Sequence, residues 1–154
     1  MATTGANTSH AARDAPCPRK ANLALDRAIT LRESLYDVFS DVAAGRRPAD
    51  LDGLNWSLAE AMQQTELVAE PHGVRLRWRK PVDLDLPRWQ MAASASAVLT
   101  SADVERLKQC PGESCGWVFL DESRNQSRRW CDSRECGNRE RVRAHYRRTH
   151  AESV

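Results

Sequence analysis

The chain has 154 residues, a formal net charge of +2 and 41% hydrophobic residues. This is the composition of a soluble globular protein, and it excludes a disordered or a membrane protein. No apolar run approaches the roughly 18 residues that span a bilayer, and the first residues lack the pattern of a signal peptide. We therefore expect a cytoplasmic protein without membrane contact, made of one modest domain and one small module.

Residues 1–20 are rich in small and polar residues, include two prolines and show no periodic apolar pattern. This composition predicts a flexible tail. Cys17 lies between Pro16 and Pro18 in this segment, and a passive exposed thiol is favoured there over a reactive one.

Two amphipathic helices are predicted to follow. Apolar residues recur at spacings of three and four from Ala28 to Val42, and Gly45 and Pro48 end the pattern. Asp50 is placed to cap the second helix. The apolar face of this second helix consists of Leu51, Leu54, Leu58 and Ala61.

A β-hairpin is predicted over residues 66–79, with strand 66–70, a turn at 71–73 and an alternating strand 74–79. The alternation separates an apolar face from a basic face. For the basic face, exposure to solvent is favoured over phosphate contact. The apolar face consists of Val74, Leu76 and Trp78, and the basic face of Arg75, Arg77 and Arg79.

A third helix is predicted to begin at Asp85 and Pro87, and Thr100 with Asp103 resembles a capping box that opens a short fourth helix. Residues 21–108 thus have the order helix, helix, hairpin, helix, which indicates an α+β domain. They contain no glycine-rich phosphate loop, nucleophile elbow or histidine pair, so we expect no enzyme. The apolar face of the third helix consists of Leu86, Trp89, Ala93 and Ala97.

Four cysteines form two pairs of equal spacing. Cys110 and Cys115 enclose four residues, Cys131 and Cys136 enclose four more, and a glycine follows the second cysteine of each pair. Two such turns supply the tetrahedral thiolate ligands that zinc prefers, and four thiolates leave no open position for water. The spacing therefore predicts a structural zinc site, favoured over an iron–sulfur cluster and over buried or disulfide-linked cysteines.

Arginines are concentrated around the second cysteine pair. Asn138 is placed to cap a final helix with Glu140 in its first turn, and Val142 and Tyr146 form a small apolar seam on this helix. Three of its arginines share one face, and the loop before it carries three more. Because the guanidinium fork suits phosphate, we interpret both groups as a nucleic-acid surface. The candidate contacts are Arg124, Arg128, Arg129, Arg139, Arg143 and Arg147.

Three aromatic residues lie between the cysteine pairs, namely Trp117, Phe119 and Trp130. A module this small needs large apolar groups for its own core, so packing is favoured for them over base stacking.

Residues 107–150 resemble the CGNR zinc finger family of bacteria. The resemblance rests on the segments Cys115–Asp121 and Ser123–Cys131 and on the run Cys136-Gly137-Asn138-Arg139. It implies that the four cysteines bind zinc and that the finger binds DNA. Residues 21–106 resemble the ABATE region, described as a stress-induced transcription regulator and thought to sense a signal. The strand-like segment with which ABATE relatives usually begin is not found in residues 1–20.

These observations predict a zinc-binding transcription regulator with a flexible tail at 1–20, an α+β sensing or dimerisation domain at 21–108 and a four-cysteine finger at 109–150. The expected partners are DNA and a small-molecule signal at the N-terminal domain. The alternatives are an RNA- or ribosome-binding zinc protein, which the same basic helix would serve, and a protein-interaction module. The oligomeric state is left open.

Overall fold

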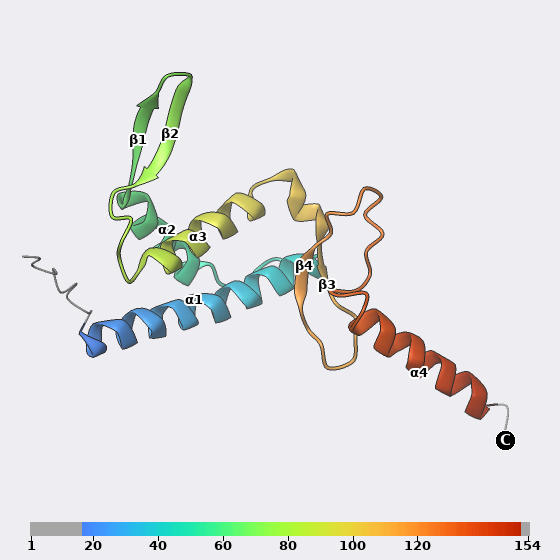
Figure 1. Ribbon diagram of the computed structural model, residues 1–154. Helices are drawn as coiled ribbons and strands as arrows, with labels where there is room; N and C mark the ends of the chain where they lie inside the picture. The colour runs from blue at the N-terminus through green and yellow to red at the C-terminus, as the bar shows by residue number, and fades with distance from the viewer. Residues whose placement is uncertain (1–16, 152–154) are drawn as a thin grey trace, which may run out of the picture.

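The computed structural model describes residues 17–151. Over these residues the protein is a mixed α/β fold with four α-helices, one 3-10 helix and two small antiparallel sheets (Figure 1). None of the helices in this range is both long and apolar enough to cross a membrane. The elements are α1 Pro18–Ala43, α2 Asp52–Gln63, β1 Thr65–Glu70, β2 Gly73–Trp78, α3 Leu86–Leu99, η1 Ala102–Arg106, β3 Leu107–Gln109, β4 Val118–Leu120 and α4 Cys136–Ala151.

The predicted tail at residues 1–20 is wrong at its C-terminal end, because α1 begins at Pro18. Proline suits the first turn of a helix, where its missing N–H group would have no helical partner. Residues 1–16 lie outside the described residues, and Cys17 directly precedes the helix with an exposed side chain.

Three helices enclose the main hydrophobic core. The apolar pattern predicted for α1 and α2 supplies Leu31 and Leu54, and α3 adds Ala92 and Ala95. All four side chains are buried, so this pattern predicted the buried sides of α1 and α2 correctly. Partly buried apolar residues pack around this cluster, namely Leu35, Phe39, Leu58, Met91 and Leu99.

The predicted start of α2 is one residue early. The Asp50 carboxylate accepts a hydrogen bond from the backbone N–H of Asp52 at 2.7 Å, but Leu51 occupies the N-cap position. Leu51 therefore lies outside the helix and remains 41% exposed instead of joining the apolar face.

The face predicted for α3 is also corrected. The helix begins after Asp85 and buries Trp89 as expected, but it also buries Ala92 and Ala95, while Ala97 is exposed. Arg88 is buried as well, with hydrogen bonds to the Ser57 hydroxyl at 3.2 Å and to the Asp85 and Glu60 carboxylates. These acidic partners replace water around the guanidinium, which explains how an arginine is accommodated in the core.

The short fourth helix is a 3-10 helix. Ser101, not Thr100, is its N-cap, and the Ser101 hydroxyl accepts from the backbone N–H of Asp103 at 3.2 Å. Thr100 instead donates its hydroxyl hydrogen to the carbonyl oxygen of Ser96 in the last turn of α3.

The hairpin rises away from the helices (Figure 1). Its strands pair with Leu67 opposite Leu76 and Ala69 opposite Val74, so the predicted apolar face exists. That face is open to solvent, since Leu67 is 74%, Val74 67% and Leu76 55% exposed. On the other face Arg75 and Arg77 form ion pairs across the strands with Glu70 and Glu66.

The cysteine region lies at the C-terminal end of α1, where β3 and β4 form the second sheet (Figure 1). Leu107 pairs with Leu120 and Gln109 with Val118. Because β3 packs against α1, the β3–β4 sheet joins the four-cysteine finger to the helical region, which consists of α1, α2 and α3.

Candidate metal centre

The four cysteines come together from three separate segments. Cys110 follows β3, Cys115 precedes β4, Cys131 ends the long loop and Cys136 is the first residue of α4. All four sulfur atoms lie within 4.8 Å of one another. The Sγ atoms of Cys115 and Cys131 are 3.5 Å apart, those of Cys131 and Cys136 3.6 Å, and those of Cys136 and Cys115 3.5 Å.

These distances fit a tetrahedral metal ion. Two sulfurs bound about 2.3 Å from zinc at the tetrahedral angle lie about 3.8 Å apart. The three separations among Cys115, Cys131 and Cys136 are a few tenths of an ångström shorter, so little movement of these side chains would admit the ion. The arrangement can therefore hold one metal ion with four cysteine ligands.

The cluster could hold four thiolates only with a cation to balance their charge. Burial, followed by the neighbouring sulfurs of Cys115, Cys136 and Cys110, raises the pKa of Cys131 to about 12. Burial alone would also raise the pKa of Cys110, but hydrogen bonds from the backbone of Cys131 and Gly112 lower it to about 7. Four thiolates crowded at this distance repel one another, and a bound divalent cation would remove that repulsion.

The two glycines after the cysteine pairs have different roles. Gly116 has φ of +67°, as expected for a chain that bends around a metal. Gly137 does not have positive φ and lies in the first turn of α4. A Cβ atom there would come within 3.1 Å of the Trp130 ring, so a larger residue at 137 would require the ring to shift by a few tenths of an ångström.

A buried carboxylate organises the loop between the cysteine pairs. Asp121 is fully buried, and its Oδ2 atom accepts from the Lys108 ammonium at 2.6 Å and from the backbone N–H of Arg128 at 3.0 Å. Its Oδ1 atom accepts from the backbone N–H and the hydroxyl of Ser123. Burial would raise the pKa of Asp121, but these donors, led by Lys108, hold it well below its usual range.

The sequence interpretation did not identify Asp121 and Lys108 as positioning residues. A signal was present, because an aspartate that ends an apolar strand and precedes serine by two residues is typical of a turn closed by its carboxylate. The Lys108 ammonium also donates to the carbonyl oxygens of Gln126 at 2.5 Å and Arg128 at 3.3 Å. Together the Asp121 and Lys108 side chains hold the basic loop, which is the arginine-containing loop between β4 and Cys131, against the β3–β4 sheet.

Two of the six candidate arginines contact backbone carbonyl oxygens or aromatic rings of the finger. The Arg128 guanidinium donates to the carbonyl oxygens of Trp130 and Cys131 and lies 4.9 Å from the centre of the Phe119 ring. Arg129 lies over the ring of Trp130 at 5.0 Å. Arg128 is therefore a structural residue that fixes the backbone at a cysteine of the cluster.

The other four candidate arginines lie at exposed or half-exposed positions. Arg143 forms an ion pair with Glu113 at 2.8 Å, and Arg147 forms one with Glu140 at 2.6 Å. Within the described range, Arg124 and Arg139 form no ion pair, and both side chains are exposed.

The final helix starts earlier than predicted. Because α4 begins at Cys136, Asn138 is inside its first turn and does not cap it. The turn before the helix is closed by Asp132, whose Oδ1 atom accepts from the backbone N–H groups of Arg134 at 2.6 Å and Glu135 at 2.9 Å.

The three aromatic residues between the cysteine pairs differ in burial, which the sequence did not predict. Phe119 and Trp130 are half-buried within the finger, as expected for packing. Trp117 is 70% exposed, so the packing role predicted for it is wrong.

Comparison with known proteins assigns both parts of the chain. Residues 2–102 match the ABATE family, described as "putative stress-induced transcription regulator", and residues 106–149 match the CGNR zinc finger family. No curated protein matches the chain. The ABATE match covers more than half of the chain, and the finger match contains all four clustered cysteines. The chain therefore belongs to the ABATE family and carries a C-terminal CGNR zinc finger.

Proposed function

We propose that this protein is a zinc-dependent transcription regulator that contacts DNA through its finger and α4. Two findings support this role, namely membership of a family described as transcription regulators and a cluster of four cysteine sulfurs within 4.8 Å of one another. The role is non-catalytic and belongs in the cytoplasm, where bacterial DNA is found. DNA is preferred to RNA as the partner because it is the expected target of a transcription regulator.

The metal in this proposal is zinc, and its role is structural. Zinc bound by Cys110, Cys115, Cys131 and Cys136 would tie β3, β4, the basic loop and the start of α4 together. With four protein ligands it has no open position for a substrate or a water molecule. The protein side chains then determine what the finger binds.

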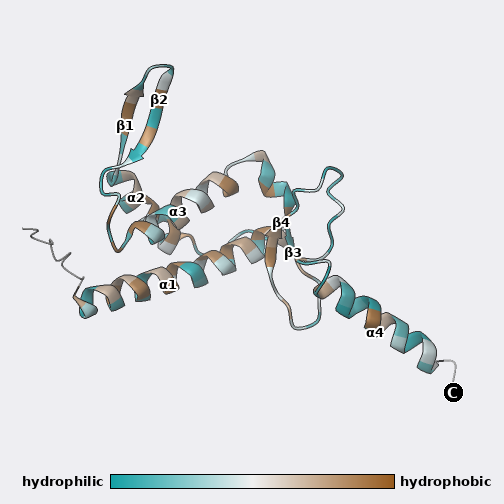
Figure 2. Ribbon diagram, in the orientation of Figure 1, coloured by the Kyte–Doolittle hydropathy of each residue, from teal (hydrophilic) through white to brown (hydrophobic). Residues whose placement is uncertain are grey.

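The observation that carries the proposal is the placement of α4. This helix leads away from the body of the protein and is hydrophilic along most of its length (Figures 1 and 2). Its 16 residues correspond to about 24 Å, and the major groove of DNA is wide enough to admit a helix. Five arginines and one glutamate lie on it, so an exposed element fixed at its start by the cysteine cluster has a strong positive charge.

Individual arginines are assigned different roles. Arg143 and Arg147 are paired with Glu113 and Glu140, but exposed ion pairs of this kind contribute little and can be exchanged for phosphate. Arg124 and Arg139 are exposed and add to the same positive field. Arg128 contributes by holding the loop in place.

The test is the salt dependence of DNA binding by the zinc-loaded full-length protein, measured by fluorescence anisotropy on several duplexes. We expect Arg143→Ala and Arg147→Ala to weaken binding to all duplexes alike. Each lost phosphate contact should reduce the slope of log affinity against log salt by about one. Arg75→Ala removes the same charge from the hairpin and should leave the slope unchanged.

If both α4 substitutions leave affinity and slope unchanged while zinc stays bound, α4 is not the DNA-binding surface. Competition between duplex DNA and RNA in the same assay separates the regulator from an RNA-binding zinc protein. A preference for RNA would reassign the partner without changing the zinc site.

A second candidate function is protein binding by the finger. Val142 and Tyr146 are exposed on α4 and, with Arg143, Arg147 and Glu113, line a shallow pocket. Exposed apolar side chains of this kind favour a protein partner. Binding to a protein that is insensitive to salt and lost on Tyr146→Ala would support this alternative.

A further inference from the structure

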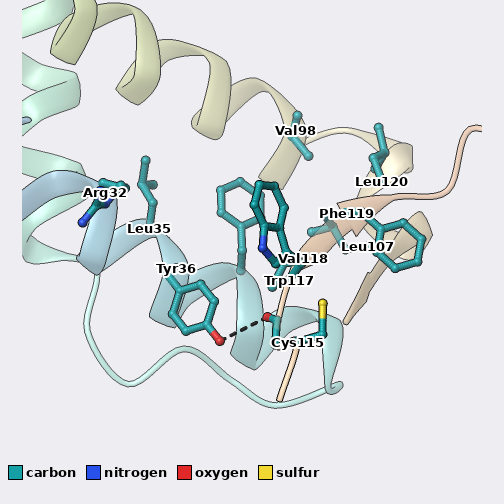
Figure 3. A pocket seen from close by; sticks show the side chains of 12 residues that line it. Arg32, Leu35, Tyr36, Val98, Leu107, Cys115, Trp117, Val118, Phe119 and Leu120 are labelled. Atoms are coloured by element: carbon teal, nitrogen blue, oxygen red, sulfur yellow. Dashed lines mark hydrogen bonds between the residues drawn. The ribbon is translucent and has the colours of Figure 1, made fainter. Parts of the chain in front are cut away.

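A pocket of about 720 Å³ lies between α1, the C-terminal end of α3 and strand β4 of the finger (Figure 3). Its volume is within the range of about 300–1,000 Å³ that is usual for small-molecule sites. It lies where the two family regions meet, and Cys115 and Gly116 form part of its wall. A molecule bound there would contact the helical region and the metal-binding region at once.

The walls of the pocket are mainly apolar. Leu35 and Phe39 on α1 are half-buried beside the hydrophobic core, and Val98 at the end of α3 faces them across the pocket. Leu107 and Val118 extend this surface onto the finger. An apolar or aromatic body would replace water on all of these side chains.

Two polar groups come from neighbouring turns of α1. Arg32 and Tyr36 are four residues apart and therefore lie on the same side of the helix as Leu35 and Phe39. The Tyr36 hydroxyl donates to the carbonyl oxygen of Gly116 at 3.1 Å (Figure 3). The pocket thus has a polar side in addition to its apolar walls.

Arg32 supplies the positive charge at the pocket. Among the described residues that line the pocket, Arg32 is the only cation and none is an aspartate or glutamate. Its present partner, Glu33, is exposed, as is Arg32 itself. Exposed pairs are weak, so Arg32 can exchange Glu33 for an anionic ligand.

We propose that this pocket binds a small organic anion, with an aromatic or branched hydrocarbon body against Leu35, Phe39 and Val98 and a carboxylate or sulfonate at Arg32. The ligand joins α1 to β4 and so stabilises one placement of the finger relative to the helical region. Any effect of the ligand on transcription rests on the proposed DNA-binding function. The binding itself does not.

The test uses 8-anilinonaphthalene-1-sulfonate, an aromatic sulfonate whose fluorescence rises in apolar surroundings. The zinc-loaded full-length protein is titrated without DNA at a temperature at which its melting curve shows it to be folded. We expect saturable binding of one dye per chain and a melting temperature that rises with dye concentration.

Three variants locate the bound dye. Arg32→Gln should weaken binding roughly tenfold, the usual cost of one hydrogen bond to a charged group. Val98→Phe should reduce binding by filling the pocket, provided that the melting curve remains cooperative. Arg19→Gln removes the same charge at the exposed start of α1 and should bind the dye as the unchanged protein does.

Equal dye affinity in Arg32→Gln and Arg19→Gln would overturn the proposal, as would fluorescence that rises only after zinc removal or melting. Both results would show that the dye binds elsewhere or to unfolded chain. Because no DNA is present, neither result would contradict the proposed DNA binding by α4. Conversely, failure of the DNA assay would not contradict dye binding in the pocket.

Discussion

The helical region and the finger are stabilised in different ways. In the helical region, three helices bury Leu31, Leu54, Ala92 and Ala95 against one another. In the finger the buried residues include two cysteines of the cluster and the charged Asp121. A segment of about forty residues encloses too little apolar surface to fold by that means alone. The helical region therefore depends on apolar packing, whereas the finger depends on metal ligation and polar contacts.

The largest predicted effect is the loss of the metal. We expect one zinc per chain, and chelation should unfold residues 110–150, because structural zinc contributes about 10–16 kcal/mol in small modules. The helices α1 to α3 should keep their circular dichroism signal. Elemental analysis and circular dichroism before and after chelation measure both outcomes.

A matched pair of cysteine variants sharpens this test. Cys136→Ser removes a sulfur from the cluster and should abolish stable zinc binding, whereas Cys17→Ser changes an exposed thiol outside the cluster and should have no effect. Iron in place of zinc, or a folded finger without metal, would contradict the comparison between the two regions.

The next largest effect should come from the helical core. Leu54 is buried among α1, α2 and α3, so Leu54→Ala should destabilise the helical region by about 2–5 kcal/mol through lost burial and a new cavity. Zinc content should not change. Leu51→Ala, at the exposed position before α2, is the control and should cost much less. Denaturant unfolding followed by circular dichroism measures the difference.

The parts of the fold that the sequence predicted well are those in which spacing alone determines the geometry. The cysteine pairs come together because two short turns can place four sulfurs around one point. The buried sides of α1 and α2 follow from the helical period, and the two faces of β2 follow from its strict alternation of apolar and basic residues.

The predictions that failed depend on tertiary contacts that spacing does not encode. Arg88 is buried because Glu60 and Ser57, from another helix, reach its guanidinium. The nucleic-acid contact of Arg128 stays a prediction, but spacing did not indicate that its guanidinium donates to the backbone carbonyls of Trp130 and Cys131. Trp117 looked like a core residue, but it lies at an exposed edge of the pocket between the two regions.

A smaller effect is expected from Asp121, the polar centre of the finger. Asp121→Asn keeps the shape but removes the charge that the Lys108 ammonium and the loop N–H groups share. The variant should lower the melting temperature of the zinc-loaded finger and loosen residues 122–130. Glu122→Gln, at the exposed neighbouring position, is the control.

The pH dependence of this effect follows from the pKa of Asp121. Since its folded-state pKa is lowered, the carboxylate stabilises the finger fully above the ordinary aspartate pKa of about 3.9 and loses this effect as the pH falls through the folded value. The difference in melting temperature between Asp121→Asn and the unchanged protein should therefore be equal at pH 6 and pH 8 with zinc in excess. If the melting-temperature difference at pH 6 is not the same as at pH 8, a group other than Asp121 is responsible.

The smallest effect is expected where the two regions meet. The hydrogen bond from the Tyr36 hydroxyl to the Gly116 carbonyl oxygen joins α1 directly to the turn that holds Cys115. Tyr36 is exposed, so water can replace the lost donor in Tyr36→Phe, and the cost should be at most about 0.5–1.5 kcal/mol. If the regions are stabilised separately, zinc affinity should stay within about twofold, the change that such a weakly coupled contact allows. A large loss of zinc affinity in Tyr36→Phe would mean that α1 is part of the metal centre, and the two regions would then have to be treated as one folding unit.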